Sequence, residues 1–347
     1  MAKIKICFVS QTGRNENPLL DPSVRYRCYH FAESLQQENY FCSVCSGNSF
    51  FESPNFYYDV YVFHRPLFND NFRREVIEIL KQKNKVLIAD YDDLIFGDSQ
   101  VASISSIVKN NNSTLEKAIE IFKNNLEALN FFDKVTVSTE ILASYVRKYN
   151  PKAKVMVAQN FIPKSLIELH AVNKTHLKHR PNTTIGYFCG TKSHNLDFPI
   201  VEEILYRVLL ENTDFSFLVI GPLTFSAALM KLPNVFIGTD VNYLKLPNIM
   251  CKCSKVIAPL EYSEFNQCKS RVKSLEAAIS GCKLIATPIQ DMLSNKYISF
   301  AETEDDWYEL LSTVIEENDR LRVANNNFND LVFLCNESVF NFKKIME

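Results

Sequence analysis

Apolar runs and amphipathic runs alternate along almost the whole chain. In its first half, short apolar runs predict β-strands at Ile4–Ser10, Phe41–Ser46, Val60–His64, Val86–Asp90, Val135–Ser138 and Val155–Ala158. Between them, apolar positions recur at the spacing of one helix face, which predicts α-helices at Val24–Gln37, Asp70–Lys83, Ser113–Leu129 and Thr139–Tyr149. Strands that alternate with helices in this way indicate a parallel α/β domain.

The second half begins the same alternation again. We expect strands at Thr184–Phe188, Phe215–Ile220, Val235–Ile237, Lys255–Ala258 and Lys283–Thr287. Helices are expected at Phe198–Leu210, Ser270–Ser280, Asp305–Glu316, Asp319–Asn329 and Ser338–Ile345. Between the halves, Pro163 to Asn182 is polar and basic with no clear period, so we expect an interdomain linker there. A chain of 347 residues suits two domains better than one core, and the pattern predicts two Rossmann-like α/β domains.

Composition excludes several classes of function. The formal net charge is −2 and no basic stripe is sustained, so nucleic acid is not expected as a partner. No apolar run approaches the roughly 20 residues that span a bilayer. The chain enters a predicted strand directly, and its ten cysteines lack the spacing of a disulfide framework or of a complete zinc site. We therefore expect a cytoplasmic protein with neither a structural metal nor a cofactor.

Residues 255–288 combine a strand, the polar loop Pro259–Lys269, an amphipathic helix that Gly281 ends, and a second strand. In a parallel sheet such a unit places the loop and the helix N-terminus at the carboxyl edge, where free N–H groups favour anions. Lys269, Lys273 and Glu276 are spaced along one helix face, which suits a ligand with phosphate and hydroxyl groups, such as a nucleotide-sugar. The alternative is an ordinary crossover helix with solvated lysines.

Polar residues also follow the predicted strand Thr184–Phe188. Gly190 at the strand end allows the backbone to approach a ligand closely, and Thr191 and Lys192 supply donors for a diphosphate. His194 follows shortly after. A plain turn is the alternative interpretation of this stretch.

Three carboxylates, Asp90, Asp92 and Asp93, lie at the end of the predicted strand Val86–Asp90. Charges so close repel one another unless a cation, a hydrogen-bond network or ligand hydroxyls compensate them. A carboxylate can also cap the turn that follows a strand, and for Asp90 we prefer this structural role.

Basic residues lie at two other strand or helix ends. Arg25 and Arg27 enter the first predicted helix, where acidic groups are usually favoured, so they are candidates for binding phosphate or an acidic sugar. A solvated helix face is the alternative, and two residues that are two apart in a helix point in different directions. His64 and Arg65 end the third strand, and His64 is either an acceptor-side residue or a satisfied structural histidine.

The run Ala258–Pro288 resembles the donor-site region of bacterial GT-B glycosyltransferases, near the retaining family 4 (group 1) enzymes. In that group Pro-Leu-Glu follows the strand, and Phe-Asn, Lys-Ser and Lys-x-x-Glu-Ala-Ala precede the glycine and the next strand. The matching positions are Pro259, Leu260, Glu261, Phe265, Asn266, Lys269, Ser270, Lys273, Glu276, Ala277, Ala278 and Gly281. Residues 190–198 are similar to the Gly-Thr-x-x-His-x-x-Asp-Phe that opens the C-terminal domain in the same group.

This resemblance implies the GT-B fold, in which two Rossmann-like domains face each other across a cleft. We expect residues 1–165 to form the N-terminal acceptor domain, 166–182 the linker and 183–335 the C-terminal donor domain. Residues 336–347 are expected to form a last helix that returns to the N-terminal domain, as GT-B enzymes often have it.

The resemblance also implies roles for the candidate residues. Lys269 and Lys273 would stabilise the departing diphosphate, and Glu276 would accept hydrogen bonds from the ribose. The remaining donor-binding candidates are Gly190, Thr191, Lys192, His194, Glu261, Asn266 and Ser270. On the acceptor side, Asp92 or Asp93 would bind acceptor hydroxyls or act as a base. The acceptor-binding candidates are Arg25, Arg27, His64 and Arg65.

The chain departs from the family pattern in two places. Cys268 stands where many family 4 enzymes have the first of two glutamates eight residues apart, and no Gly-Gly loop follows the first strand. A different resemblance competes at Asp90–Asp93, because GT-A glycosyltransferases hold a divalent ion on the donor diphosphate with an Asp-x-Asp motif. GT-A chains lack the second Rossmann-like half that residues 183–335 predict.

The expected activity is transfer of a sugar from a nucleotide-sugar donor to a growing surface glycan, such as a lipopolysaccharide or capsule chain, with retention. The acceptor would be a glycan or a lipid-linked glycan, with peripheral contact to the inner face of the cytoplasmic membrane, and no divalent metal would be essential. One alternative is a nucleotide-sugar epimerase or hydrolase on the same fold. Another is a non-catalytic subunit that binds a nucleotide-sugar.

Overall fold

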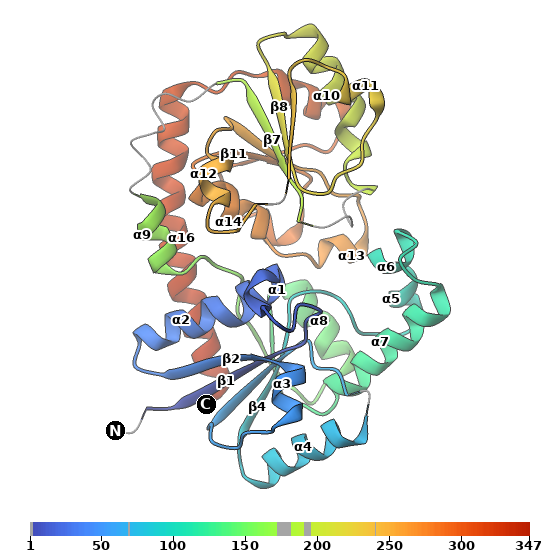
Figure 1. Cartoon of the computed structure of the whole chain (residues 1–347), viewed down its shortest axis with the longest axis vertical. Coiled ribbons are helices and arrows are strands. Elements are labelled where there is room, and N and C mark those ends of the chain that lie inside the picture. Colours follow the sequence, from blue (N-terminus) through green and yellow to red (C-terminus); the bar gives the residue numbers. More distant parts are fainter. Residues whose placement is uncertain (1–2, 69, 172–181, 191–195, 240) are drawn as a thin grey trace. The chain divides into compact units, whose positions relative to one another are not determined.

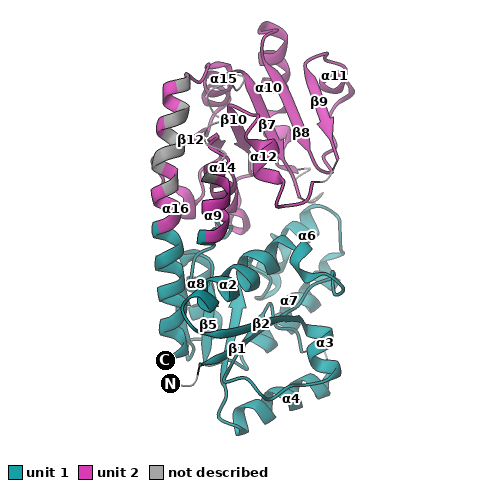
Figure 2. Ribbon diagram, turned by 60° about the vertical axis from the view of Figure 1, so that its left-hand side comes forward, with its two compact units in different colours: residues 1–164, 268–270, 333–347 teal, residues 165–267, 271–332 magenta. Residues whose placement is uncertain are grey.

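A computed structural model describes residues 3–68, 70–171, 182–190, 196–239 and 241–347 of the chain. The chain divides into two compact units, coloured separately in Figure 2. Unit 1 comprises residues 1–164, 268–270 and 333–347, and unit 2 comprises residues 165–267 and 271–332. Each unit has its own parallel sheet of six strands, which confirms the predicted α/β class.

The sheet of unit 1 has the strand order β2-β1-β3-β4-β5-β6 and is parallel throughout. Its strands are β1 (Lys5–Ser10), β2 (Phe41–Ser46), β3 (Val60–His64), β4 (Val86–Tyr91), β5 (Lys134–Val137) and β6 (Lys154–Val157). The register pairs Ser10 with His64, His64 with Asp90, and Asp90 with Thr136. A row of buried polar residues therefore crosses the carboxyl edge of the sheet.

Side-chain caps start the longer helices of unit 1. Asp70, Thr114 and Thr139 each accept a hydrogen bond from the backbone N–H three residues further on, which satisfies a donor that the first helical turn leaves without a partner. The helices are α1 (Pro22–Val24), the π-helix η2 (Arg25–Tyr29), α2 (His30–Gln37), α3 (Gly47–Glu52), α4 (Asn71–Gln82), α5 (Ser99–Ser103), α6 (Ser106–Lys109), α7 (Leu115–Leu129) and α8 (Glu140–Tyr149), and a 3-10 turn covers Pro18–Leu20.

The first predicted helix, Val24–Gln37, starts earlier and is less regular than its pattern indicated. Asp21 caps it by accepting from the Ser23 amide, and Pro22 occupies the first helical position, which suits a residue without an N–H. A π-helical turn, which is rare and concentrated at functional sites, then covers Arg25–Tyr29. Arg25 and Arg27 of this turn are both buried, so neither lies on a solvated face.

The sheet of unit 2 has the order β12-β11-β10-β7-β8-β9 and is also parallel. Its strands are β7 (Thr184–Phe188), β8 (Ser216–Ile220), β9 (Val235–Gly238), β10 (Lys255–Ala258), β11 (Lys283–Ala286) and β12 (Ile298–Phe300). The sequence pattern did not predict the short edge strand β12. Successive residues of β10 enter different core clusters, Ile257 one and Val256 and Ala258 the other, because side chains alternate between the faces of a strand.

Helices cover both faces of this second sheet (Figure 1). Trp307 and Leu311 of α15 (Glu304–Ser312) pack in one core cluster with Leu205 of α10 (Pro199–Glu211). The other cluster includes Met250 of α12 (Leu246–Met250) and Ala277 of α14 (Val272–Ile279). Two short helices, α11 (Ala227–Met230) and α13 (Glu264–Gln267), and a 3-10 turn at Gln290–Met292 complete the unit.

The end of the chain is one helix, α16 (Glu317–Met346), where two helices were predicted. No glycine or proline interrupts residues 317–346, so nothing in the sequence ends the first predicted helix. Residues 333–347 belong to unit 1, where Phe342 stacks on Phe8. The side chains of Lys134 and Lys154, the first residues of β5 and β6, donate to carbonyls in the last turn of α16. Positive charge is favoured at a helix C-terminus.

The predicted linker Pro163–Asn182 is partly helical, because α9 covers Lys164–Ala171. Ile167 and His170 are both buried and lie three residues apart, which is the spacing of one helix face. The basic composition of the segment hid this spacing in the sequence. Residues 172–181 lie outside the described part of the chain. Within the ranges that the structure covers, no helix is both long and apolar enough to pass through a bilayer.

Candidate active site

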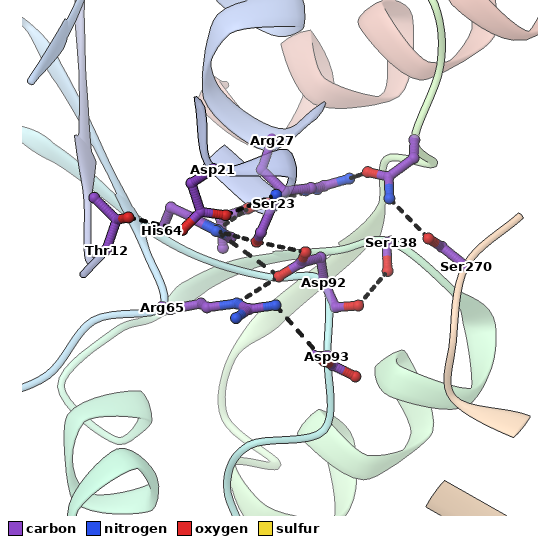
Figure 3. A network of polar contacts seen from close by, with 12 residues as sticks. Thr12, Asp21, Ser23, Arg27, His64, Arg65, Asp92, Asp93, Ser138 and Ser270 are labelled. Atoms are coloured by element: carbon purple, nitrogen blue, oxygen red, sulfur yellow. Dashed lines mark hydrogen bonds and ion pairs between the residues drawn. The ribbon is translucent and has the colours of Figure 1, made fainter. Parts of the chain in front are cut away.

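The polar row at the carboxyl edge of the first sheet is the centre of a buried hydrogen-bond network (Figure 3). Asp90 occupies its middle and is 1% exposed. Arg27 binds it with two nitrogens, at 3.0 Å from Nε to Oδ2 and 2.5 Å from Nη2 to Oδ1. Thr136 Oγ1 donates to Oδ1 at 2.7 Å, and His64 Nδ1 lies 3.1 Å from Oδ2. The network corrects the expectation that Asp90 caps a turn.

The guanidinium of Arg27 is enclosed by the protein. Its Nη1 donates to the Ala158 carbonyl at 2.6 Å and to Asn160 Oδ1 at 3.0 Å, and the side chain has no exposed surface. Burial alone would raise the pKa of Asp90, but the Arg27 charge and the hydrogen bonds from Arg27 and His64 outweigh it and lower the pKa to about 2. Arg27 therefore lies where it stabilises the charge of Asp90.

His64 links Asp90 to Asp92 through Ser23. The Ser23 hydroxyl donates to Asp92 Oδ2 at 2.6 Å and lies 2.8 Å from His64 Nε2. Because a hydroxyl has only one hydrogen and Asp92 accepts it, Nε2 must donate to Ser23 for both contacts to be hydrogen bonds. Nδ1 lies within hydrogen-bond distance of Asp90 Oδ2, so the imidazole ring connects Asp90 with the Ser23–Asp92 pair.

Arg65 binds the other oxygen of Asp92. Its Nε donates to Oδ1 at 2.7 Å, and its Nη2 lies 3.7 Å from Asp93 Oδ2. Burial alone would raise the pKa of Asp92, but the Arg65 and His64 charges and the hydrogen bonds from Arg65 and Ser23 lower it below its usual range. Asp92 therefore stays ionised, although its side chain is only 10% exposed.

Protein cations and hydrogen bonds lie beside these carboxylates. Arg27 neutralises Asp90, and Arg65 neutralises Asp92 and lies near Asp93. Over the residues that the structure describes, no group of three or more His, Cys, Asp or Glu side chains is arranged to hold a metal ion.

Several members of the network were not among the predicted site residues. Ser23 is the most important, because it joins His64 to Asp92. The sequence did hold a signal for it, since an aspartate before a proline marks a helix start and would have placed Ser23 in the first turn. Asn160 had no such signal, because only the fold brings the end of β6 beside Arg27.

Part of the donor-like loop lies in unit 1. Residues 268–270 cluster with this unit, where Thr139 Oγ1 donates to the Cys268 carbonyl at 3.1 Å. Asn160 Nδ2 donates to Ser270 Oγ at 2.8 Å, and Figure 3 marks this bond by the dashed line that ends at Ser270. The structure thus places Lys269 and Ser270 in unit 1, whereas the prediction had placed all of the loop in the second domain.

In unit 2, Lys273 and Glu276 lie on α14 at the carboxyl end of β7. Lys273 Nζ donates to the Phe188 carbonyl at 2.8 Å and to Glu276 Oε2 at 3.0 Å, and its side chain is 29% exposed. Gly281 has a φ of +66° just beyond the helix and ends it, as the sequence predicted. The ammonium therefore lies beside the strand that Gly190 follows.

Other predicted donor residues organise the backbone of this edge. Asn266 Nδ2 donates to the Glu261 carbonyl at 2.8 Å, and the Glu261 amide donates to Asp197 Oδ1 at 2.9 Å. These bonds hold the loop after β10, and Asn266 is itself buried. Thr191, Lys192 and His194 lie outside the described residues.

A glycine is required where β8 ends beside β7. Gly221 has a φ of +107°, and a Cβ there would lie 1.8 Å from the carbonyl oxygen of Cys189. A Cβ at Gly190 would meet no atom of the described residues within 4 Å. The close approach of Gly221 to the end of β7 therefore shapes this edge.

Comparison with known proteins gives matches at the level of structure. No family model matches the sequence, and no curated protein matches it. The α,α-trehalose 6-phosphate synthase of Burkholderia multivorans has a TM-score of 0.62 at 9% identity, covering 100% of this chain and 98% of that one. The sucrose-phosphate synthase of Thermosynechococcus elongatus has a TM-score of 0.60 at 12% identity, covering 99% and 96%.

A further match is TarM of S. aureus, in a structure with UDP, at a TM-score of 0.55 and 12% identity. It covers 83% of this chain but only 55% of TarM, so the chain spans about half the length of TarM. The shared architecture of two units, each built on a parallel sheet of six strands, is that of GT-B glycosyltransferases. The chain therefore has the GT-B fold.

Proposed function

We propose that this protein is a glycosyltransferase that moves a sugar from a nucleotide-sugar donor to a hydroxyl of a growing bacterial surface glycan, with retention. The observation that carries the proposal is the hydroxyl held between His64 and Asp92 in unit 1. A site that holds one hydroxyl between a carboxylate and a ring N–H can bind a second hydroxyl by the same chemistry.

In this proposal Asp92 is the group that receives the acceptor proton or the acceptor hydrogen bond. Its Oδ2 already accepts a hydrogen bond from Ser23, and Arg65 fixes its Oδ1. His64 acts as a donor, because its two nitrogens face the Asp90 carboxylate and the Ser23 oxygen. Asp93, near Arg65 and partly exposed, is a further candidate for contact with acceptor hydroxyls.

The proposed donor groups are Lys273 and Glu276 of unit 2, with Lys269 of the segment 268–270. An ammonium that binds a backbone carbonyl and one carboxylate can exchange those partners for diphosphate oxygens, since all are hydrogen-bond acceptors. Fixed cations would stabilise the charge that develops on the departing diphosphate. Glu276 would accept hydrogen bonds from the ribose, in line with the resemblance of residues 258–288 to family 4 enzymes.

The finer parts of the proposal concern the acceptor. We propose that the acceptor is a lipopolysaccharide or capsule chain, free or linked to lipid. We also propose that the enzyme acts at the inner face of the cytoplasmic membrane. Exposed basic residues at Arg147, Lys148, Lys152 and Lys154 would favour contact with anionic lipid headgroups. No divalent metal is assigned a role, because protein cations already balance the carboxylates of the site.

Two measurements test the proposal. A thermal-shift screen of UDP, GDP, ADP and CMP against the full chain should find one nucleotide that stabilises it, by about 2.7 kcal/mol at a hundred times its Kd. The corresponding nucleotide-sugar should then release its nucleotide only when a glycan acceptor is added. NMR of the product should show the anomeric configuration of the donor.

The same assay separates the other functions. Rapid turnover of donor without acceptor would indicate an epimerase or hydrolase instead. Binding of the donor without turnover, whichever acceptor is added, would indicate a non-catalytic subunit that binds a nucleotide-sugar. Absence of any nucleotide effect, in both the thermal shift and the release assay, would contradict the proposal as a whole.

A further inference from the structure

Arg65 has an unusual backbone conformation. Four non-glycine residues in the described ranges have a positive φ, and three of them are asparagines, at positions 39, 84 and 111. Asparagine tolerates this region because its short side chain bonds to the local backbone. Arg65, at a φ of +51°, has no such compensation, and Pro66 after it restricts its backbone further. Strain of this kind is unfavourable and persists only where the surrounding structure requires it.

The strained backbone brings Arg65 into contact with two aspartates at once. The Arg65 amide donates to the Asp90 carbonyl at 2.8 Å, so the chain bends sharply at the end of β3. From this bend the side chain reaches Asp92, at 2.7 Å from Nε to Oδ1. In the view of Figure 3, Ser23 lies above the Asp92 carboxylate and Arg65 lies below it.

The consequence for Asp92 is a fixed orientation. Its Oδ1 is bound by Arg65 and its Oδ2 by Ser23, so the carboxylate cannot rotate without breaking one of the two bonds. Charge-assisted bonds from a guanidinium are among the strongest in proteins. The side chain of Arg65 is 27% exposed, so it lies at the rim of the network rather than beneath it.

We propose that Arg65 is a positioning residue, kept in a strained conformation so that its guanidinium fixes Asp92 with Oδ2 directed at the hydroxyl position occupied by Ser23. This inference rests on the proposed function, because Asp92 is the group proposed above to receive the acceptor proton or the acceptor hydrogen bond. It replaces the earlier expectation that Arg65 binds the acceptor directly.

The strain is tested by the stability of two variants. Arg65→Gly and Arg65→Ala both remove the guanidinium, but only glycine relaxes at a positive φ. We therefore expect Arg65→Gly to melt about 2–4 °C above Arg65→Ala, since 1 kcal/mol shifts the melting temperature by about that amount in a unit of this size. Asn84→Gly and Asn84→Ala form the matched control, because Asn84 has a φ of +54° and precedes β4 at the opposite edge of the sheet.

The contact with Asp92 is tested by a double-mutant cycle. Arg65→Gly and Asp92→Asn are combined, and the shift in melting temperature is compared with the sum of the single shifts. We expect the melting temperature of the double variant to fall by clearly less than that sum, because each single change already removes the ion pair between Arg65 and Asp92. Additive shifts, or Arg65→Ala melting at or above Arg65→Gly, would overturn the proposal whether or not the protein transfers sugar.

The positioning role is tested by kinetics. We expect Arg65→Gly to lower kcat about 100-fold with little change in KM for the donor, because a displaced carboxylate affects the chemical step more than donor binding. Arg65→Lys should recover only part of the loss, since an ammonium lacks the planar fork. Added guanidinium should restore activity to Arg65→Gly and have no such effect on the Asn84 variants.

The outcomes separate this inference from the proposed function. If the unchanged protein transfers no sugar, the proposed function fails, and the stability measurements alone decide the contact of Arg65 with Asp92. If the unchanged protein transfers sugar and Arg65→Gly is equally active, the positioning role is wrong and the proposed function stands.

Discussion

Replacing Asp90 by asparagine tests the buried network most directly. The substitution removes one negative charge without creating a cavity, and it leaves Arg27 as a buried cation with no counter-charge in contact. Breaking a buried ion pair by removing one partner destabilises a protein by about 3–5 kcal/mol. The amide retains an oxygen that can accept from Arg27, so we expect a loss near the lower end of that range, about 3 kcal/mol.

The pKa of Asp90 gives a second estimate. It lies at about 2 in the folded protein against an ordinary value of 3.8, a difference worth about 2–3 kcal/mol at 1.36 kcal/mol per pKa unit. Because the folded pKa is the lower one, this contribution is complete well above pH 3.8 and is lost as the pH falls towards 2. By pH 3, about 1 kcal/mol of it should be gone.

Urea unfolding followed by circular dichroism at pH 7 and at pH 3 measures both effects. The gap between the unchanged protein and Asp90→Asn should be about 3 kcal/mol at pH 7 and should narrow at pH 3. Asp59→Asn is the matched control, because Asp59 is exposed and should shift stability by less than about 1 kcal/mol. A gap below 1 kcal/mol at pH 7, or one that does not narrow, would refute the reasoning.

Three further changes have defined outcomes. Lys273→Ala should weaken binding of the nucleoside diphosphate at least about tenfold, measured by calorimetry, because a cation beside a phosphate contributes more than 1.4 kcal/mol. His30, whose pKa burial lowers to about 3, stays neutral in the folded state while the unfolded chain protonates below 6.5, so His30→Gln should flatten the loss of stability in urea unfolding between pH 6.5 and 3. Gly221→Ala should destabilise unit 2 by more than about 3 kcal/mol, whereas Gly190→Ala should change its free energy of unfolding by less than about 1 kcal/mol. The fluorescence of Trp307, which lies in the core of unit 2, measures both changes.

Regular elements were largely predictable from the sequence because their signals are local. The strands Phe41–Ser46, Val60–His64, Thr184–Phe188 and Lys255–Ala258 have the predicted bounds. They are short, mainly apolar runs, and such runs can be recognised without tertiary context. The prediction was wrong where basic composition and apolar spacing indicated different structures. The segment Lys164–Ala171 was predicted as linker because it is polar and basic, but it forms α9.

The polar network was only partly predictable. His64 ends a strand, and Arg65 and Asp92 follow strands, so their place at the carboxyl edge followed from the alternation of strands and helices. Their pairing did not, because it depends on which strands are neighbours and on the register between them. Arg27 was predicted to bind an acceptor, yet the π-helical turn points it into the sheet edge against Asp90.

The sequence by itself determined the α/β class, the division of the chain into two halves and the polar residues at the strand ends. These features could be predicted because hydrophobic periodicity is a local pattern, set by residues that are close in the chain. Only the tertiary structure decided that Ser23 joins His64 to Asp92, that Arg65 adopts a strained bend to reach the same carboxylate, and that residues 268–270 lie in unit 1. These contacts join residues that are distant in the chain, and their geometry depends on strand order and register, which local patterns do not encode.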